Sequence, residues 1–297
     1  MVKFTFLSYF DIGKKFIHKF EADLFINNSF TSYSFGQHKT TYMSNLISEK
    51  IFRFSAFNVS HGNSSMPIGT DSILLGCWSP LGPGKKILDI GTGCGVISLI
   101  LANRIKKEFT IEAIDIDKNS IDECNYNFSN SPWPQHLNVF HKSLQEWEGN
   151  GYDLIVCNPP FFNTGPHSPK KVRAQARHQV SLTIESLLFN CAKKLNKDGK
   201  LCLILPFLEK ETLFSLANKM EWGIEKCTWF RSYETKPYKR ILVSLVKNTA
   251  TTISPLEKQN SITQYNKNGS WHEEYLALAG FIHHPDSLNK NSLKEQF

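Results

Sequence analysis

The chain has 297 residues, of which 41% are hydrophobic and 12% aromatic, and its formal net charge is +7. That length and apolar content support one large domain with its own core. The positive charge suits a polyanionic partner such as a nucleic acid. No stretch approaches the run of about 20 apolar residues that a membrane span needs. The amino terminus also lacks the apolar core of a secretory signal. We therefore expect a cytoplasmic protein that does not enter a membrane.

The seven cysteines do not suggest a disulfide framework or a metal site. No two of them are spaced as Cys-x-x-Cys, and several lie in apolar, strand-like runs such as LCLIL and LIVCN. This pattern is typical of reduced core cysteines in a cytosolic protein. We predict no metal ion.

Residues 1–48 differ from the rest of the chain, because they are rich in Phe, Ser, Asn, Thr and Lys and show no clean periodicity. The preferred interpretation is a translation start placed too far upstream, with the native chain beginning at Met43. The alternative is an appended segment that folds onto the domain or binds RNA through Lys14, Lys15 and Lys19. Residues 49–297 are expected to form the main domain.

From residue 84 onward, strands alternate with helices. The expected strands are 85–91 (KKILDIG), 110–117, 137–143, 152–157 (YDLIVC), 200–206 (KLCLILP), 224–231 and 240–247. The expected helices are 96–107, the stretch after 117 through 130, 181–196, and a segment near 209–221. Residues 248–269 are polar and are expected to form a loop, whereas 271–282 has the pattern of a short terminal helix.

This alternation predicts an α/β fold with a parallel sheet covered on both faces. Right-handed crossovers then give a doubly wound, Rossmann-like sheet of seven strands. The last two strands are joined by only a short polar segment, 232–239, so we expect the last strand to be antiparallel.

A glycine-rich loop follows the first strand of this pattern and opens a helix. Gly91, Gly93 and Gly95 allow a tight turn and close approach of the backbone to a ligand. Their spacing is Gly-x-Gly-x-Gly, whereas the dinucleotide fingerprint is Gly-x-Gly-x-x-Gly, which disfavours a pyrophosphate. Asp89 precedes the glycines, where its carboxylate could meet a cationic group. Asp115 ends the second strand, where an acid can accept both hydroxyls of a ribose.

The segments LDIGTGCGVISL and AIDID resemble motifs I and II of class I S-adenosylmethionine-dependent methyltransferases. The resemblance implies that S-adenosylmethionine is the cofactor. It also implies that the loop at 91–95 borders the methionine part of the cofactor and that Asp115 holds the ribose.

A second motif, Asn158-Pro159-Pro160-Phe161, follows the fourth strand directly. Two prolines leave the end of the strand rigid and outside any ladder, at the edge where open α/β sheets bind substrates. An adenine amino group is a poor nucleophile because its lone pair is delocalised into the ring. A carboxamide oxygen and a rigid carbonyl can each accept one of its N–H bonds, and a phenyl ring can stack on the base.

This second motif resembles motif IV of amino-methyltransferases, Asn/Asp-Pro-Pro-Tyr/Phe. The resemblance implies a planar, conjugated nitrogen as the acceptor: adenine N6, guanine N2 or a glutamine amide. On this basis Asn158, Pro159, Pro160 and Phe161 are the candidate catalytic residues, and Asn158 also borders the cofactor.

The segment before the glycine-rich loop, MPIGTDSILLGCW, narrows the substrate. Thr70 and Asp71 can cap a helix that starts there. Together with NPPFF, the triplet ARH at 176–178, KPYKRILVSL and the stretch 275–279, the segment closely resembles the bacterial valine tRNA adenine-37 N6-methyltransferase family over roughly residues 52–282. The resemblance implies N6-methylation of adenine 37 in valine tRNA, with Thr70 and Asp71 helping to enclose the cofactor.

One position departs from that family, which commonly has an acid after the third strand in contact with the cofactor adenine. Ser143 stands there, so we expect a single hydrogen bond from its hydroxyl or a backbone amide in place of the carboxylate. A milder departure is Phe162, where the family often has an aromatic residue of either type.

Two basic clusters are candidates for contacts with tRNA phosphates. The first follows the catalytic motif and contains Lys170, Lys171, Arg173, Arg177 and His178. The second contains Lys236, Lys239 and Arg240. No obligate protein partner is implied, so we expect a monomer.

Three other functions share parts of these motifs. A glutamine-N5 methyltransferase of release factors usually carries an N-terminal helical domain, and the first 48 residues lack such a pattern. An rRNA guanine-N2 methyltransferase stays open on the residues alone. A non-catalytic RNA-binding protein would not need the intact motif at Asn158. Fold alone does not decide among these functions.

Overall fold

The computed structural model describes residues 50–64, 67–81, 86–159, 182–247 and 259–288. The proposed extension at 1–48 and its lysines, and the basic cluster at Lys170–His178, lie outside the described residues. The division between residues 48 and 49 stays a prediction.

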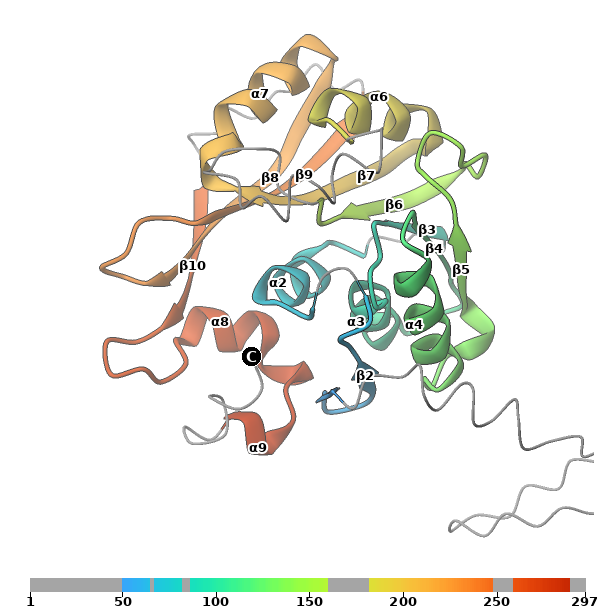
Figure 1. The fold of residues 1–297 in the computed structure, drawn as a ribbon. Helices are drawn as coiled ribbons and strands as arrows, with labels where there is room; N and C mark the ends of the chain where they lie inside the picture. The colour runs from blue at the N-terminus through green and yellow to red at the C-terminus, as the bar shows by residue number, and fades with distance from the viewer. Residues whose placement is uncertain (1–49, 65–66, 82–85, 160–181, 248–258, 289–297) are drawn as a thin grey trace, which may run out of the picture. The chain divides into compact units, whose positions relative to one another are not determined.

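The main sheet has eight strands in the order β10-β8-β9-β7-β6-β3-β4-β5 (Figure 1). Their bounds are β3 Lys86–Ile90, β4 Thr110–Asp115, β5 Leu137–His141, β6 Tyr152–Cys157, β7 Leu195–Pro206, β8 Trp222–Tyr233, β9 Arg240–Lys247 and β10 Gln259–Tyr265. Strands β5, β4, β3, β6 and β7 are parallel, and β9 runs antiparallel to both β7 and β8. The predicted doubly wound fold and its antiparallel strand are therefore confirmed.

Helices cover both faces of the sheet, as Figure 1 shows. One face packs against α2 (Thr70–Trp78), α3 (Val96–Arg104), α4 (Lys118–Ser129) and α8 (Glu273–Ala279), in a cluster that includes Leu99, Cys124 and Tyr275. The other face packs against α6 (Ile184–Lys194) and α7 (Lys210–Lys219). Because both faces are covered, the central strands are apolar almost throughout, as in KILDI and LCLIL.

The loop predicted over 248–269 is wrong in part, because Gln259–Tyr265 forms β10, parallel to β8. Its sequence, QNSITQY, contains a single aliphatic residue, Ile262, so no apolar alternation marks it as a strand. One of its polar side chains bonds to a residue that is distant in sequence: Thr263 accepts a hydrogen bond from the Arg231 guanidinium at 3.1 Å. The sheet therefore has eight strands rather than seven.

A hairpin and four short helices complete the described chain. A two-stranded hairpin, β1 (Ile51–Arg53) with β2 (Asn58–Ser60), precedes the sheet and was not predicted. The short helices are η1 Pro134–His136, η2 Phe207–Glu209, η3 Gly280–Ile282 and α9 Pro285–Leu288. All seven cysteines are buried and free, which confirms their assignment to the core. Within the described ranges, no helix has the length and apolar character needed to cross a bilayer.

The order of the central strands fixes where a ligand can bind. The chain leaves β3 for β4 and β5 on one side, and then returns to place β6 on the other side of β3. At such a switch point the connections after the two neighbouring strands diverge and leave a crevice at their carboxyl ends. Gly91 follows β3, and Asn158 follows β6. The fold therefore brings both predicted motifs to one crevice.

Candidate functional site

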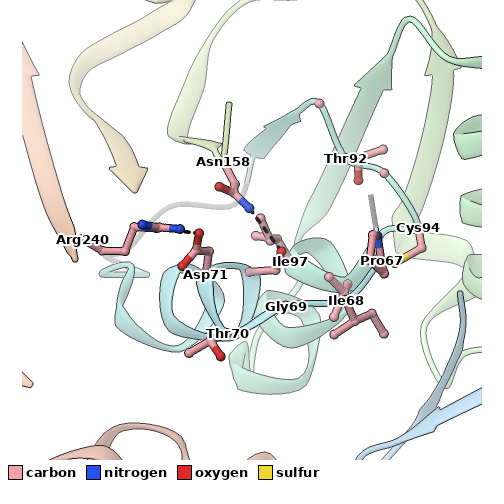
Figure 2. Close-up of a pocket in the computed structure, with 14 residues that line it drawn as sticks. Pro67, Ile68, Gly69, Thr70, Asp71, Thr92, Cys94, Ile97, Asn158 and Arg240 are labelled. Atoms are coloured by element: carbon pink, nitrogen blue, oxygen red, sulfur yellow. Dashed lines mark hydrogen bonds and ion pairs between the residues drawn. The ribbon is translucent and has the colours of Figure 1, made fainter. Parts of the chain in front are cut away.

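A pocket of about 280 Å³ lies at this crevice, and Figure 2 shows part of its wall. Four parts of the chain line it: the start of α2 with the residues before it, the loop between β3 and α3, Asn158 after β6, and Arg240 at the start of β9. The predicted site residues in its lining are Thr70, Asp71, Gly91, Gly93, Asn158 and Arg240. Sequence reasoning missed others, among them Pro67, Ile68, Ser72, Thr92, Cys94 and Ile97.

The loop after β3 leaves room for a ligand at two of its glycines. Gly91 has φ +68° and Gly93 has φ +55°, a left-handed region that side chains rarely adopt. A Cβ atom built on either residue meets nothing within 4 Å. The open space beside this backbone is the cradle that the loop offers to a ligand.

Gly95, the third predicted loop residue, does not line the pocket. A Cβ atom there would lie 2.6 Å from Cε1 of Phe128 and 2.8 Å from Sγ of Cys124. This glycine therefore allows the loop to press against α4, and its structural role is packing.

Asp89 is fully buried at the end of β3 and also lies outside the pocket lining. Its Oδ2 accepts hydrogen bonds from the hydroxyls of Ser98 at 2.7 Å and Thr92 at 2.8 Å, while Oδ1 has no partner among the described residues. Burial raises the pKa of Asp89 to about 6, although the hydrogen bonds from Ser98 and Thr92 lower it. The carboxylate thus anchors the loop from inside.

Asp115 ends β4 beside the loop, and only 8% of its surface is exposed. Its Oδ2 accepts from the backbone N–H of Gly93 and its Oδ1 from that of Asp117, both at 2.9 Å. Burial raises the pKa of this carboxyl, and the two backbone bonds oppose the rise. Since each carboxylate oxygen can accept a second hydrogen bond, Asp115 is able to hold two hydroxyls while it holds the loop.

Asn158 follows β6 and points toward the start of α2 (Figure 2). Its Nδ2 donates to the hydroxyl of Ser72 at 3.3 Å. Its Oδ1 is buried and has no hydrogen-bond partner among the described residues. A buried acceptor left without a donor is costly, so this oxygen is suited to a ligand that brings an N–H. Pro159 is buried beside it, whereas Pro160 and Phe161 lie outside the described residues.

Asp71 and Arg240 form an ion pair in the wall of the pocket, with Nε at 2.7 Å from Oδ2 (Figure 2). The pair joins α2 to β9 across 169 positions of sequence. Asp71 does not cap α2 as predicted: the N-cap is Gly69, which has no side chain to accept a bond. Arg240 therefore belongs to the pocket, apart from the exposed Lys236 and Lys239 with which the sequence grouped it.

Ser143 follows β5 by two residues and lies outside the pocket lining. Its hydroxyl donates to Oε2 of Glu146 at 2.8 Å, and its backbone N–H donates to the same oxygen at 3.2 Å. The assignment of Ser143 to the cofactor adenine stays a prediction. Across the described ranges, no three His, Cys, Asp or Glu side chains cluster in a way that could hold a metal ion.

Comparison with known proteins places this site in a family. The model of the methyltransferase small domain matches residues 62–221. The tRNA1(Val) (adenine(37)-N6)-methyltransferase of Vibrio vulnificus strain YJ016 is 36% identical over 210 residues, which cover 70% of this chain and 87% of that protein. The enzyme of the same name from Tolumonas auensis is 33% identical over 228 residues, or 77% of this chain and 94% of its own.

A solved structure supports the fold alone. A predicted O-methyltransferase from Agrobacterium tumefaciens superimposes with a TM-score of 0.54 at 13% identity, over 72% of this chain and 98% of that one.

The buried Asp89 gives stability a specific pH dependence. Its pKa of about 6 in the folded protein lies above the value of about 3.9 in an unfolded chain, so the folded state binds the proton more tightly. Protonated Asp89 therefore stabilises the folded protein, and this stabilisation is fully present below about pH 4. It amounts to a free energy on the order of 3 kcal/mol, which is lost as the pH rises through about 6. We expect Asp89→Asn to remove this fall in unfolding free energy, measured by urea titration at several pH values. An equal fall in both proteins would contradict it.

The ribose assignment of Asp115 predicts a loss of discrimination between ligands. Asp115→Ala should weaken binding of S-adenosylhomocysteine about tenfold or more, since two hydrogen bonds to a charged group disappear. The wild type should also bind the 2′,3′-dideoxy analogue more weakly than the parent, whereas the variant should bind both equally in calorimetry. If the variant still prefers the parent compound, Asp115 acts only on the loop. Asp122→Ala, an exposed acid on α4, is the control.

Proposed function

The chain belongs to the family of the tRNA1(Val) (adenine(37)-N6)-methyltransferases, and from this premise we propose that it methylates N6 of adenine 37 in the anticodon loop of valine tRNA. It is a methyltransferase of class I fold that uses S-adenosylmethionine. The observation that supports an amino-group acceptor is the buried Oδ1 of Asn158 in the pocket lining, which has no hydrogen-bond partner among the described residues.

The chemistry of the acceptor explains why this oxygen matters. The exocyclic nitrogen of adenine is planar and conjugated, so its lone pair is weakly available. In this proposal Oδ1 of Asn158 accepts one N–H of that amine, and the backbone carbonyl of Pro159 accepts the other. Two such bonds orient the nitrogen and draw its lone pair out of the ring, so catalysis rests on positioning and needs no strong base. S-adenosylmethionine, when bound, would supply a methyl group activated by its positively charged sulfur. Transfer to nitrogen would release S-adenosylhomocysteine as a neutral thioether, and the methylated amine would lose one proton to water.

The remaining residues divide between the cofactor and the base. The loop at Gly91 and Gly93 offers the open backbone surface for the cofactor, and the acid beside it, Asp115, holds the ribose. Thr70 and the Asp71–Arg240 pair close the opposite wall. Phe161 stacks on the target adenine in this proposal.

The RNA approaches from the side of the pocket that carries the β8–β9 connection. Lys236 and Lys239 are exposed there, and Lys239 directly precedes Arg240 of the pocket wall. The backbone of Lys239 is fixed, because its N–H donates to the carbonyl of Phe230 at 2.8 Å and its carbonyl accepts from Phe207 at 3.0 Å. We assign this pair, with Lys170, Lys171, Arg173, Arg177 and His178, to contacts with phosphates.

We further propose that the enzyme acts in the cytoplasm and as a monomer. Seven free, buried cysteines suit a reducing compartment. The monomeric state follows the expectation from the sequence, where no obligate protein partner is implied.

The central test is methyl transfer from labelled S-adenosylmethionine to total RNA from a strain without this protein, followed by nucleoside analysis. Label in N6-methyladenosine of the valine tRNA supports the proposal. Asn158→Ala should lower kcat by at least about a thousandfold, because the amine is no longer oriented, while cofactor affinity stays within about threefold. Ser72→Ala, which removes only the bond to Nδ2, should retain most of the activity. Label in methylguanosine of rRNA, or in release factors, would reassign the substrate.

The lysine assignment predicts a defect in tRNA affinity alone. The double variant Lys236→Glu/Lys239→Glu should raise KM for tRNA about tenfold or more, leave kcat within about twofold, and reduce the salt dependence of log KM by about one to two. The matched control is Lys106→Glu/Lys107→Glu. These two lysines are also exposed but precede β4, at the opposite end of the sheet. Equal effects of both double variants would indicate general charge attraction, and would remove the specific surface.

A further inference from the structure

One face of α4 carries two buried polar side chains outside the pocket. Glu123 is 5% exposed and Asn127 is 2% exposed. They are four residues apart in a helix, so they lie on the same side, one turn from each other. Burial of a carboxylate and a carboxamide is costly unless their hydrogen bonds are satisfied. Their partners therefore show what the helix face holds.

Asn127 joins two backbone segments at once. Its Oδ1 accepts from the backbone N–H of Ser60 at 2.8 Å, and its Nδ2 donates to the carbonyl of Ser60 at 2.9 Å. The same Nδ2 donates to the carbonyl of Cys94, inside the glycine-rich loop, at 2.8 Å. One side chain thus ties the end of β2 to the loop that lines the pocket.

Glu123 holds the next residues of the same segment. Its Oε1 accepts from the N–H of Asn63 at 3.3 Å, and its Oε2 accepts from the N–H of Ser64 at 2.9 Å. Bonds from backbone amides to a buried carboxylate are stronger than bonds between neutral groups. Residues 60–64 are therefore held along α4 by both side chains.

This segment comes shortly before a part of the pocket lining in the sequence. Pro67 lies three residues beyond Ser64, and Pro67 to Ser72 line the pocket together with residues of the loop. The loop itself also packs on the same face of α4, because Gly95 lies against Cys124 and Phe128. Residues 60–64 and the loop are thus both attached to α4, the first through the bonds of Glu123 and Asn127 and the second through the bond of Asn127 and the packing of Gly95.

We propose that Glu123 and Asn127 are positioning residues for the cofactor pocket, which they keep at its binding width by fixing residues 60–64 to the glycine-rich loop. The proposal rests on the proposed function, because it takes the pocket to hold S-adenosylmethionine. Neither side chain lines the pocket, so they act through the backbone that they hold. Their loss affects cofactor affinity far more than the chemical step, which depends on Asn158.

The experiment is calorimetric titration of the full chain with S-adenosylmethionine and S-adenosylhomocysteine, together with steady-state kinetics and amide hydrogen exchange. Asn127→Ala should raise both dissociation constants and the KM for the cofactor about tenfold, because the net contribution of a single buried hydrogen bond corresponds to about that factor. At saturating cofactor, kcat should stay within about twofold. Glu123→Gln, a smaller change of the same shape, should act in the same direction.

Hydrogen exchange separates positioning from general loss of stability. Asn127→Ala should speed exchange at the amide of Ser60, and Glu123→Gln at those of Asn63 and Ser64, while the central strands stay protected. The matched control is Asn130→Ala. That residue is exposed and lies three residues beyond Asn127. Among the described residues, its Nδ2 donates to the carbonyl of Tyr126 in the same helix.

Two outcomes count against the idea in different ways. If the wild type binds cofactor and the folded Asn127→Ala and Glu123→Gln variants bind it equally well, the positioning proposal is overturned while the function stands. If the wild type binds neither compound, the proposed function fails first. Should Asn127→Ala not fold, Glu123→Gln decides by the same comparison.

Discussion

The pairing of β3 with β4 on one side and β6 on the other is the constraint on which the site depends. Both pairings are parallel, and Ile90 aligns with Ile114 in one ladder and with Cys157 in the other. The three strands therefore end level with one another. Gly91 and Asn158 directly follow the ends of β3 and β6 and line one crevice, while Asp115, the last residue of β4, accepts from the N–H of Gly93 in the loop beside it.

Buried polar groups then set the shape of that crevice. Asp89 holds the loop from beneath through the hydroxyls of Thr92 and Ser98. Asp115 holds it from the side through the N–H of Gly93, and Asn127 holds it through the carbonyl of Cys94. A loop with left-handed glycines would otherwise have many conformations. Three buried side chains from three different elements restrict it to one, which reduces the entropy that a ligand must overcome on binding.

The loop between β3 and α3 does not determine which acceptor is methylated, because the residues proposed for the cofactor and for the acceptor lie in different parts of the chain. In the proposed function, the residues assigned to the cofactor lie at and after the ends of β3 and β4, whereas Asn158, assigned to the acceptor, follows β6. Changing the substrate therefore requires changes at the second group and at the surfaces beside it. The exposed lysines of the β8–β9 connection and the Asp71–Arg240 pair are the described features that join the pocket to such a surface.

The fold class, the two motifs and the family could be predicted from the amino-acid sequence, because these depend on local patterns. Apolar runs followed by Gly91 or by Asn158 indicate where buried strands end, and the glycine spacing disfavours a pyrophosphate loop. The sequence did not predict β10, since QNSITQY becomes a strand by pairing with β8. It also grouped Arg240 with exposed lysines, because the charge of a residue does not say which way its side chain points. Only the tertiary structure showed that Arg240 turns to Asp71, that Gly95 serves packing, and that Glu123 and Asn127 join segments about 30 to 70 residues apart. Such contacts depend on which helix face meets which backbone, and no local pattern in the sequence encodes that choice.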